Sequence, residues 1–227
     1  MNYTCYIFDL DDTLLDFKAG EEKGLRSVFS TFHKQPVPFE DWLTNYHEIN
    51  QATWQQIEAG ALAQPLLDTR FAKTFATFGQ AIDGVAAEAH FRQVLDTNDA
   101  ILPDSKELLA SLADKGVKLI AGTNGKTATQ YQRLAMTGFD RYFQHIVISG
   151  EIGHAKPSRA FFDHIFRLYP QYQPSDFIMI GDSLQSDIVG AKQAQIDSVW
   201  LPNQTTTSAI KPTYQVASLA ELAEILL

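Results

Sequence analysis

The sequence Tyr3-Thr4-Cys5-Tyr6-Ile7-Phe8 leads directly into the acidic run Asp9-Leu10-Asp11-Asp12-Thr13. The first run is short and rich in aromatic and β-branched residues, which is typical of a buried strand. The second run places carboxylates where that strand ends. In α/β proteins, ligands bind at the carboxyl ends of the strands. We therefore predict a strand at residues 3–8 and a functional site immediately after it.

Strand-like and helix-like segments alternate along the chain from Pro103 onward. Each apolar run of strand length is followed by a segment with helical periodicity. The predicted strands are 117–121, 146–148, 177–180 and 198–201, and the predicted helices are 104–115, 127–137, 159–168, 188–194 and 219–227. Such alternation favours a parallel sheet with helices on both faces. The predicted fold class is therefore α/β, with a Rossmann-like parallel sheet as its core.

A purely helical segment separates the first strand from this alternation. Amphipathic helical periodicity marks residues 19–32, 39–58, 61–78 and 85–95. Because strands reappear only after this segment, we interpret it as an insertion. The predicted domains are an α/β core made of residues 1–15 and 100–227, and an inserted all-helical domain made of residues 16–99.

Composition limits the classes of function. The chain has 227 residues, of which 45% are hydrophobic, and this is enough for a sizeable core. With 18 basic and 27 acidic residues the formal net charge is −9, so we expect neither nucleic-acid binding nor adsorption to an anionic membrane. Cys5 is the single cysteine, so no intrachain disulfide can form. We expect a cytoplasmic protein without a membrane span, either a monomer or a small homo-oligomer.

Reactive side chains follow four of the predicted strands, and a parallel sheet would bring them to one rim. Neighbouring carboxylates repel one another, and a divalent cation removes that repulsion. Oxygen ligands without histidine or cysteine favour Mg²⁺. In chain order the side chains are Asp9 and Asp11, then Thr123 and Asn124, then Lys156, and finally Asp182 with Asp187.

The spacing of Asp9 and Asp11 suggests a division of labour, because residues i and i+2 of a strand point to the same side. Asp9 can attack a phosphorus atom and form an aspartyl-phosphate. Asp11 can give a proton to the leaving oxygen and later take one from water. Lys156 would supply positive charge and Thr123 a hydroxyl for the phosphoryl oxygens.

These motifs, in this order along the whole chain, resemble those of the haloacid dehalogenase-like hydrolase superfamily. The helical insertion lies where that superfamily has its type-one cap. The resemblance implies that Asp9, Asp182 and the backbone carbonyl of Asp11 bind Mg²⁺, supported by Asp187, and that Thr123 and Lys156 hold the phosphoryl group. Dehalogenases lack the second aspartate, so Asp11 favours a phosphoester substrate. The motifs are Asp9-Leu10-Asp11-Asp12-Thr13, Thr123-Asn124, Lys156-Pro157, and Gly181-Asp182-Ser183 with Asp187.

Within the superfamily, the chain is similar to the noncanonical pyrimidine nucleotidase branch of bacteria. This implies a 5′-nucleotidase acting on pyrimidine nucleoside monophosphates. Asn124 and Phe17 are the candidate substrate-binding residues, and Phe17 can either stack on a base or pack under the cap. The similarity is carried by Phe8 to Leu14, Trp54, Glu58-Ala59-Gly60, Arg70-Phe71, Thr123-Asn124-Gly125, Gly153-His154-Ala155-Lys156-Pro157, Pro212-Thr213-Tyr214 and Ser218 to Leu222, with His154 departing from the small or aliphatic residue expected there.

Plainer interpretations stay open for single residues. Thr123-Asn124-Gly125 is also an ordinary turn sequence, and Lys156 could be a surface lysine, as most lysines are. Asp187 could simply cap a helix. Two other functions also stay open. One is a small-metabolite phosphatase acting on phosphoglycolate or a sugar phosphate, and the other is a non-catalytic phosphate- or partner-binding module.

Overall fold

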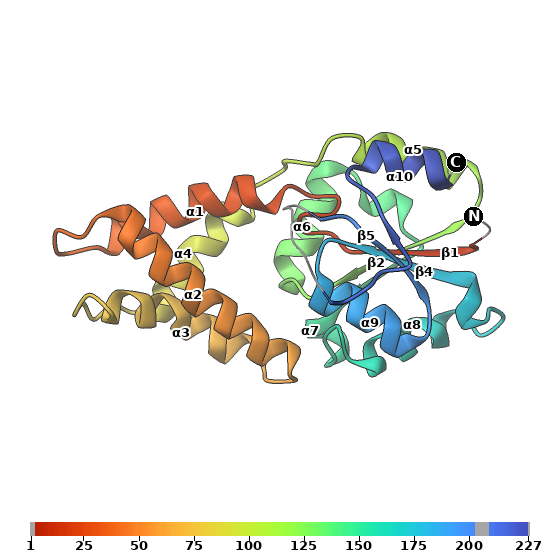
Figure 1. Cartoon of the computed structure of the whole chain (residues 1–227). Coiled ribbons are helices and arrows are strands. Elements are labelled where there is room, and N and C mark those ends of the chain that lie inside the picture. The colour runs from red at the N-terminus through yellow and green to blue at the C-terminus, as the bar shows by residue number, and fades with distance from the viewer. Residues whose placement is uncertain (1–2, 203–208, 227) are drawn as a thin grey trace. The chain divides into compact units, whose positions relative to one another are not determined.

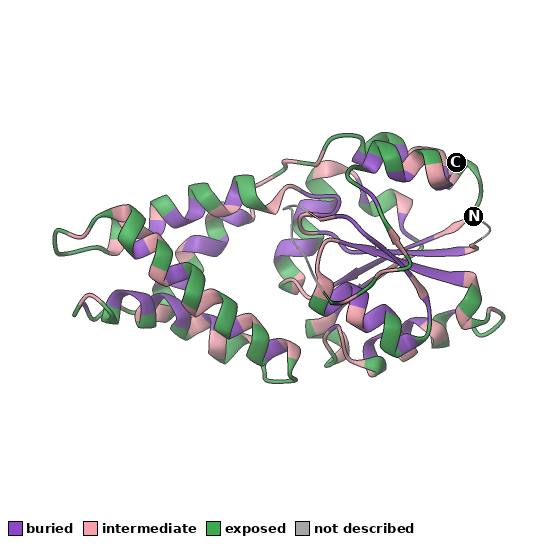
Figure 2. Cartoon of the chain, viewed as in Figure 1, coloured by how far each residue is buried: buried purple, intermediate pink, exposed green. Residues whose placement is uncertain are grey.

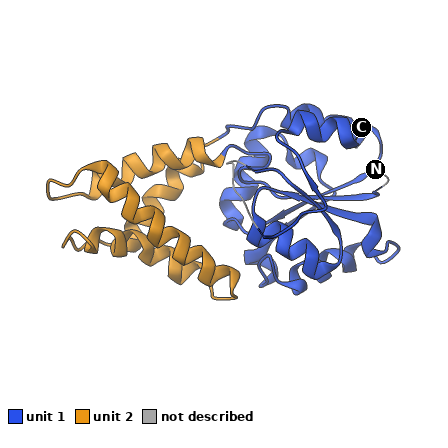
Figure 3. Ribbon diagram, in the orientation of Figure 1, with its two compact units in different colours: residues 1–16, 99–227 blue, residues 17–98 orange. Residues whose placement is uncertain are grey.

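The computed structural model describes residues 3–202 and 209–226. The chain forms two compact units (Figure 3). One unit consists of residues 1–16 and 99–227, and the other of residues 17–98.

A parallel sheet forms the centre of the first unit (Figure 1). Within the described residues it has six strands in the order β3-β2-β1-β4-β5-β6, and every neighbouring pair is parallel. The predicted α/β fold class is therefore confirmed. The strands are β1 (Cys5–Phe8), β2 (Lys118–Thr123), β3 (His145–Ile148), β4 (Phe177–Gly181), β5 (Asp197–Trp200) and β6 (Tyr214–Gln215).

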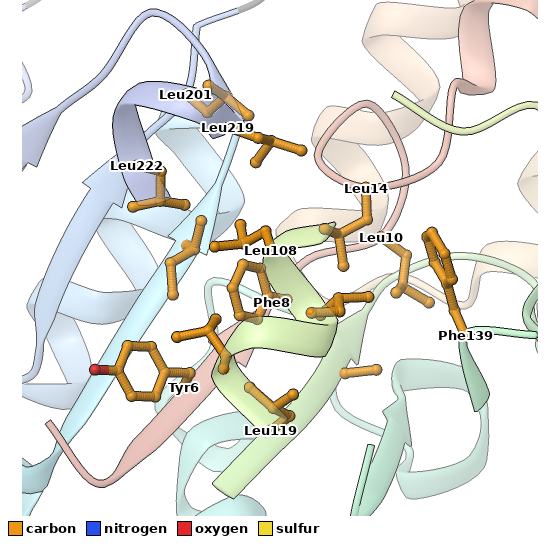
Figure 4. Close-up of a cluster of buried hydrophobic side chains, with 14 of the residues drawn as sticks. Tyr6, Phe8, Leu10, Leu14, Leu108, Leu119, Phe139, Leu201, Leu219 and Leu222 are labelled. Atoms are coloured by element: carbon orange, nitrogen blue, oxygen red, sulfur yellow. The ribbon is translucent and has the colours of Figure 1, made fainter. Parts of the chain in front are cut away.

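Helices cover both faces of this sheet because the strands are apolar on both sides, as the buried strands of Figure 2 show. Tyr6 and Phe8 of β1 pack toward α5 (Ser105–Asp114), α6 (Thr127–Thr137) and α10 (Leu219–Leu226). Figure 4 shows Tyr6 and Phe8 in this cluster. Cys5 and Ile7 alternate to the other face, where α8 (Arg159–Leu168) and α9 (Val189–Ala194) lie.

Four helices make up the second unit: α1 (Phe17–Phe32), α2 (Phe39–Glu58), α3 (Ala63–Ala76) and α4 (Gly84–Leu95). Its core is aromatic, with Trp42, Phe71 and Phe75 in contact. A buried ion pair also ties α3 to α4, because a guanidinium nitrogen of Arg70 lies 2.8 Å from a carboxylate oxygen of Glu88. The helices predicted for this segment thus form and share one hydrophobic core.

Most boundaries lie within two or three residues of the predicted ones, and the differences have local causes. The strand predicted at 117–121 runs on to Thr123, because the ladder with β3 continues to that residue. The helix predicted at 188–194 is preceded by a π-helical turn, Leu184–Ile188. The helix predicted at 219–227 covers Leu219–Leu226, and Leu227 lies outside the described residues.

A few short elements were not predicted. They are β6, α7 (Ser149–Ile152) and the 3₁₀ turns Asp140–Tyr142 and Pro174–Asp176. Elements of two to four residues are too short to show a hydrophobic period. Among the described residues, no helix combines the length and apolar character that crossing a membrane requires.

We predict that Leu112→Ala lowers the free energy of unfolding by about 2–5 kcal/mol, because the side chain is fully buried between α5 and the sheet. Urea unfolding of purified protein measures this loss. Lys106→Ala, at an exposed position of the same helix, is the matched control and should stay within about 0.5 kcal/mol of the wild type. Equal losses in the two variants would contradict the packing assigned to α5.

Candidate active site

The carboxyl ends of β1, β2 and β4 meet because β1 lies between the other two in register. Phe8 pairs with Ala121 of β2 and with Ile180 of β4. The backbone N–H of Asp9 continues the ladder by donating to the carbonyl of Ile180 at 2.9 Å. Asp9, Thr123 and Asp182 therefore follow or end three adjacent strands at one rim of the sheet.

Lys156 connects two carboxylates at this rim. Its Nζ lies 2.7 Å from Oδ1 of Asp9 and 2.7 Å from Oδ1 of Asp187, and its side chain is almost completely buried. An ammonium group is buried only at a high cost in free energy unless it is paired, and here two carboxylates pair with it. Lys156 is therefore not a surface lysine.

Asp187 holds its carboxylate against the end of β4. Oδ1 accepts from Lys156, and Oδ2 accepts from the backbone N–H of Ser183 at 3.0 Å. Gly181 makes room for it, because a Cβ at that position would lie 2.1 Å from Oδ2 of Asp187. The carboxylate of Asp187 thus fixes the lysine and the loop that follows β4.

Asp182 lies beside this pair. Its backbone N–H donates to Oγ1 of Thr13 at 3.1 Å, and its carbonyl accepts from Nε1 of Trp200 at 2.8 Å. Carboxylate oxygens of Asp9, Asp182 and Asp187 lie within 4.8 Å of one another. Three carboxylates against one ammonium leave an excess of negative charge, and oxygen-only ligands suit a hard divalent cation. These residues fit a magnesium site.

Burial and the neighbouring charges shift the pKa values of these groups. The pKa of Asp9 is raised to about 7, chiefly by burial; Lys156 opposes this rise and Asp187 adds to it. Burial and the neighbouring carboxylates of Asp9 and Asp187 also raise the pKa of Asp182. Burial works against the charged form of Lys156, but the carboxylates of Asp187 and Asp9 outweigh it and raise the pKa of the amine. A divalent cation would stabilise the ionised carboxylates.

Asp11 is held by a helix that sequence reasoning did not connect to the site. Its Oδ1 pairs with the guanidinium of Arg133, and its Oδ2 accepts from Nε2 of Gln130. Gln130 Nε2 also donates to Oγ1 of Thr123 at 3.3 Å. Both α6 residues are buried. The signal that could have found them is a pair of polar residues, three apart, on the inner face of an amphipathic helix.

The two candidate substrate-binding residues have other contacts in the structure. Asn124 donates from Nδ2 to the carbonyl of Lys156 at 2.8 Å and accepts the Lys156 N–H on Oδ1 at 2.9 Å. Its amide therefore holds the backbone of the lysine loop. Phe17 belongs to the helical unit and packs, partly buried, against the aromatic core of that unit. A contact of either residue with substrate stays a prediction.

The sequence profile of haloacid dehalogenase-like hydrolases matches residues 3–195. The chain belongs to the haloacid dehalogenase-like hydrolase family. The family resemblance stated from the motifs is thus confirmed, and the chain is an enzyme of the hydrolase class.

Several known proteins are similar to this chain over nearly its whole length. The pyrimidine 5′-nucleotidase PynA of Streptococcus pneumoniae is 34% identical, over 100% of this chain and 96% of its own. The pyrimidine 5′-nucleotidase YjjG of Escherichia coli is 30% identical, over 100% of this chain and 99% of its own. The HAD-hydrolase YfnB of Bacillus subtilis has a crystal structure bound to magnesium. It superposes with a TM-score of 0.91 at 32% identity, covering 100% of this chain and 99% of that one.

We predict that Mg²⁺ stabilises the protein more at about pH 8 than at about pH 5.5, because protonated carboxylates do not bind the ion. In the folded protein the pKa of Asp9 is about 7, so the carboxyl keeps its proton up to about that pH, whereas in the unfolded chain it loses the proton near its ordinary pKa of 3.8. Stability without metal should therefore fall as the pH rises through this window. At about pH 8, Mg²⁺ at about a hundredfold over its dissociation constant should add about 2.7 kcal/mol.

Thermal unfolding with Mg²⁺ or with a chelator, at both pH values, measures this effect. Asp182→Asn should reduce the stabilisation, whereas Asp114→Asn, at an exposed position of the same unit, should leave it unchanged. A stabilisation that is equal at both pH values, or that survives in Asp182→Asn, would contradict a magnesium site at these carboxylates.

Proposed function

We propose that this enzyme is a magnesium-dependent 5′-nucleotidase that hydrolyses pyrimidine nucleoside monophosphates through an aspartyl-phosphate intermediate. The observation that carries the proposal is the carboxylate of Asp9, which Lys156 holds at 2.7 Å inside a cluster of carboxylates at the strand ends. The substrate class is supported by the similarity to PynA and YjjG, which are named pyrimidine 5′-nucleotidases.

In the first step an oxygen of Asp9 attacks the phosphorus atom, and the bond from phosphorus to the ester oxygen breaks. Lys156 fixes the nucleophile and offers positive charge to the phosphoryl oxygens. The hydroxyl of Thr123 donates a hydrogen bond to the same group. Asp11 enters this step as a carboxylic acid and gives its proton to the leaving nucleoside oxygen, so that the nucleoside departs as a neutral alcohol. The side chain of Asp11 keeps 26% exposure, which leaves it accessible to a substrate.

In the second step water attacks the phosphorus of the aspartyl-phosphate. Asp11, now a carboxylate, takes the proton of that water, the bond to Asp9 breaks, and inorganic phosphate leaves. Both side chains return to their starting states. Asp9 and Asp11 thus serve both halves of the reaction, and loss of Asp11 would slow both steps.

Asp9, Asp182 and the backbone carbonyl of Asp11 would hold Mg²⁺, and Asp187 would support them through Lys156. The ion would supply positive charge for a phosphoryl oxygen. We further propose that residues 17–98 act as the cap of the enzyme and select the leaving group, with Phe17 as a candidate contact to the base. The buried, free Cys5 agrees with a reducing compartment, and we propose the cytoplasm.

A panel of phosphate esters tests the substrate class. We expect purified protein with Mg²⁺ to release phosphate from UMP and dTMP with a higher kcat/KM than from phosphoglycolate or sugar phosphates. Preference for phosphoglycolate or a sugar phosphate would replace the nucleotidase by a small-metabolite phosphatase. No release from any ester would favour a non-catalytic binding module.

We predict that Asp9→Asn lowers turnover of UMP by about 10³-fold or more, because an amide oxygen is a poor nucleophile toward phosphorus. Phosphate release measures turnover, and circular dichroism verifies that the fold is kept. Asp114→Asn is the control and should retain full activity. Substantial turnover by Asp9→Asn would remove Asp9 as the nucleophile.

A further inference from the structure

Helix α6 brings two polar side chains to the acid/base residue of the site. Gln130 and Arg133 are three positions apart, so they lie on one face of the helix. Arg133 is fully buried and pairs with Oδ1 of Asp11, 122 positions away along the chain. A buried guanidinium is costly in free energy unless it is paired. Arg133 therefore depends on a carboxylate that the reaction uses.

Gln130 connects this carboxylate to the phosphate-binding hydroxyl. Its Nε2 has two hydrogens, and it contacts both Oδ2 of Asp11 and Oγ1 of Thr123. Thr123 Oγ1 also accepts from the backbone N–H of Gly125 at 3.0 Å. A hydroxyl has two acceptor lone pairs and one donor hydrogen. Since both lone pairs are used, the O–H of Thr123 remains to donate to a phosphoryl oxygen.

Gly125 makes the close approach of Gln130 possible. A Cβ at position 125 would lie 1.9 Å from Nε2 of Gln130, so any larger residue must push the amide away. The amide itself is almost fully buried, which limits the orientations open to it. The turn after β2 and the first turns of α6 are thus shaped around one amide group.

We propose that Gln130 and Arg133 are positioning residues for phosphoryl transfer: Arg133 and Gln130 hold Asp11 for its proton transfers, and Gln130 also orients the hydroxyl of Thr123. The proposal rests on the function proposed above. When Asp11 gives its proton to the ester oxygen it becomes a carboxylate, and the guanidinium of Arg133 stabilises that anion. The same anion then takes the proton of the attacking water. Arg133 thus acts through Asp11 in both steps and does not touch the substrate.

The choice of leaving group separates this role from a merely structural one. A nucleoside oxygen needs a proton to depart, whereas p-nitrophenolate departs readily without one. Single-turnover experiments with enzyme in excess over substrate report the first step alone. With Mg²⁺ present, we expect Arg133→Met to slow release of uridine from UMP about tenfold to a hundredfold more than release of p-nitrophenol from p-nitrophenyl phosphate.

Matched variants of the same helix serve as controls. Leu134→Ala removes a buried side chain next to Arg133 without altering the contacts of Asp11, and it should slow both esters by the same factor. Arg133→Lys keeps the positive charge and should recover part of the selective loss. Where Arg133→Met does not fold, Arg133→Lys carries the same comparison, with a smaller selective loss.

A double-mutant cycle tests the part played by Gln130. Gly125→Ala keeps the N–H that Thr123 accepts but displaces the amide of Gln130. It should slow uridine release in the wild-type background and have no further effect in a Gln130→Ala background. Additive losses would mean that Gly125 acts on its own, and they would overturn the role of Gln130.

The outcomes also separate this inference from the proposed function. Wild-type protein that hydrolyses both esters, with Arg133→Met slowing them equally, overturns the positioning role of Arg133 and leaves the phosphatase intact. Wild-type protein that releases nothing from either ester overturns the proposed function, and this inference with it. A selective loss with UMP, recovered in part by Arg133→Lys, supports both.

Discussion

The ammonium group of Lys156 between Asp9 and Asp187 is the interaction on which the rest of the site depends. Its Nζ lies 2.7 Å from an oxygen of Asp9, which is 147 positions away along the chain, and 2.7 Å from an oxygen of Asp187, which is 31 positions away. Both contacts are buried. Removing the amine would leave two buried carboxylates facing each other, and breaking a buried pair in this way costs several kcal/mol. Surrounding contacts serve this pair. Asn124 holds the lysine backbone, and Gly181 leaves room for the carboxylate of Asp187.

The parallel register of the sheet explains why such distant residues meet. β1 is the central partner of β2 and β4, so the residues that leave these three strands reach the same rim. The buried faces of β1 keep that register, because a shift by one residue would exchange Tyr6 and Phe8 with Cys5 and Ile7. The packing of the sheet therefore fixes where the strand ends lie. The segments between the strands carry Asp11, Lys156 and Asp187 to these ends.

The strands and long helices could be predicted because each has enough residues to show its hydrophobic period. The strand ends that carry Asp9 and Asp182 could be predicted because an apolar run changes there to acidic residues. The partners of those residues were harder to find. Gln130 and Arg133 are ordinary helix formers, and only the three-dimensional packing of α6 reveals that they face inward. The contacts of Asn124 likewise depend on where residue 156 returns in space. A single sequence does not show which residues, distant along the chain, come into contact in the fold.

The two buried basic side chains of the site, Lys156 and Arg133, pair with different carboxylates. Lys156 pairs with Asp9, the proposed nucleophile, and Arg133 pairs with Asp11, so each of these two carboxylates has its own positive partner. Asp182 and Asp187 add negative charge beside Asp9. Burial is the main cause of the raised pKa values of Asp9 and Asp182, and neighbouring carboxylates raise them further. A substrate phosphate would add further negative charge. A divalent cation at these carboxylates resolves both repulsions at once, whereas a further lysine or arginine, with one charge and no open coordination positions, would resolve only part of them.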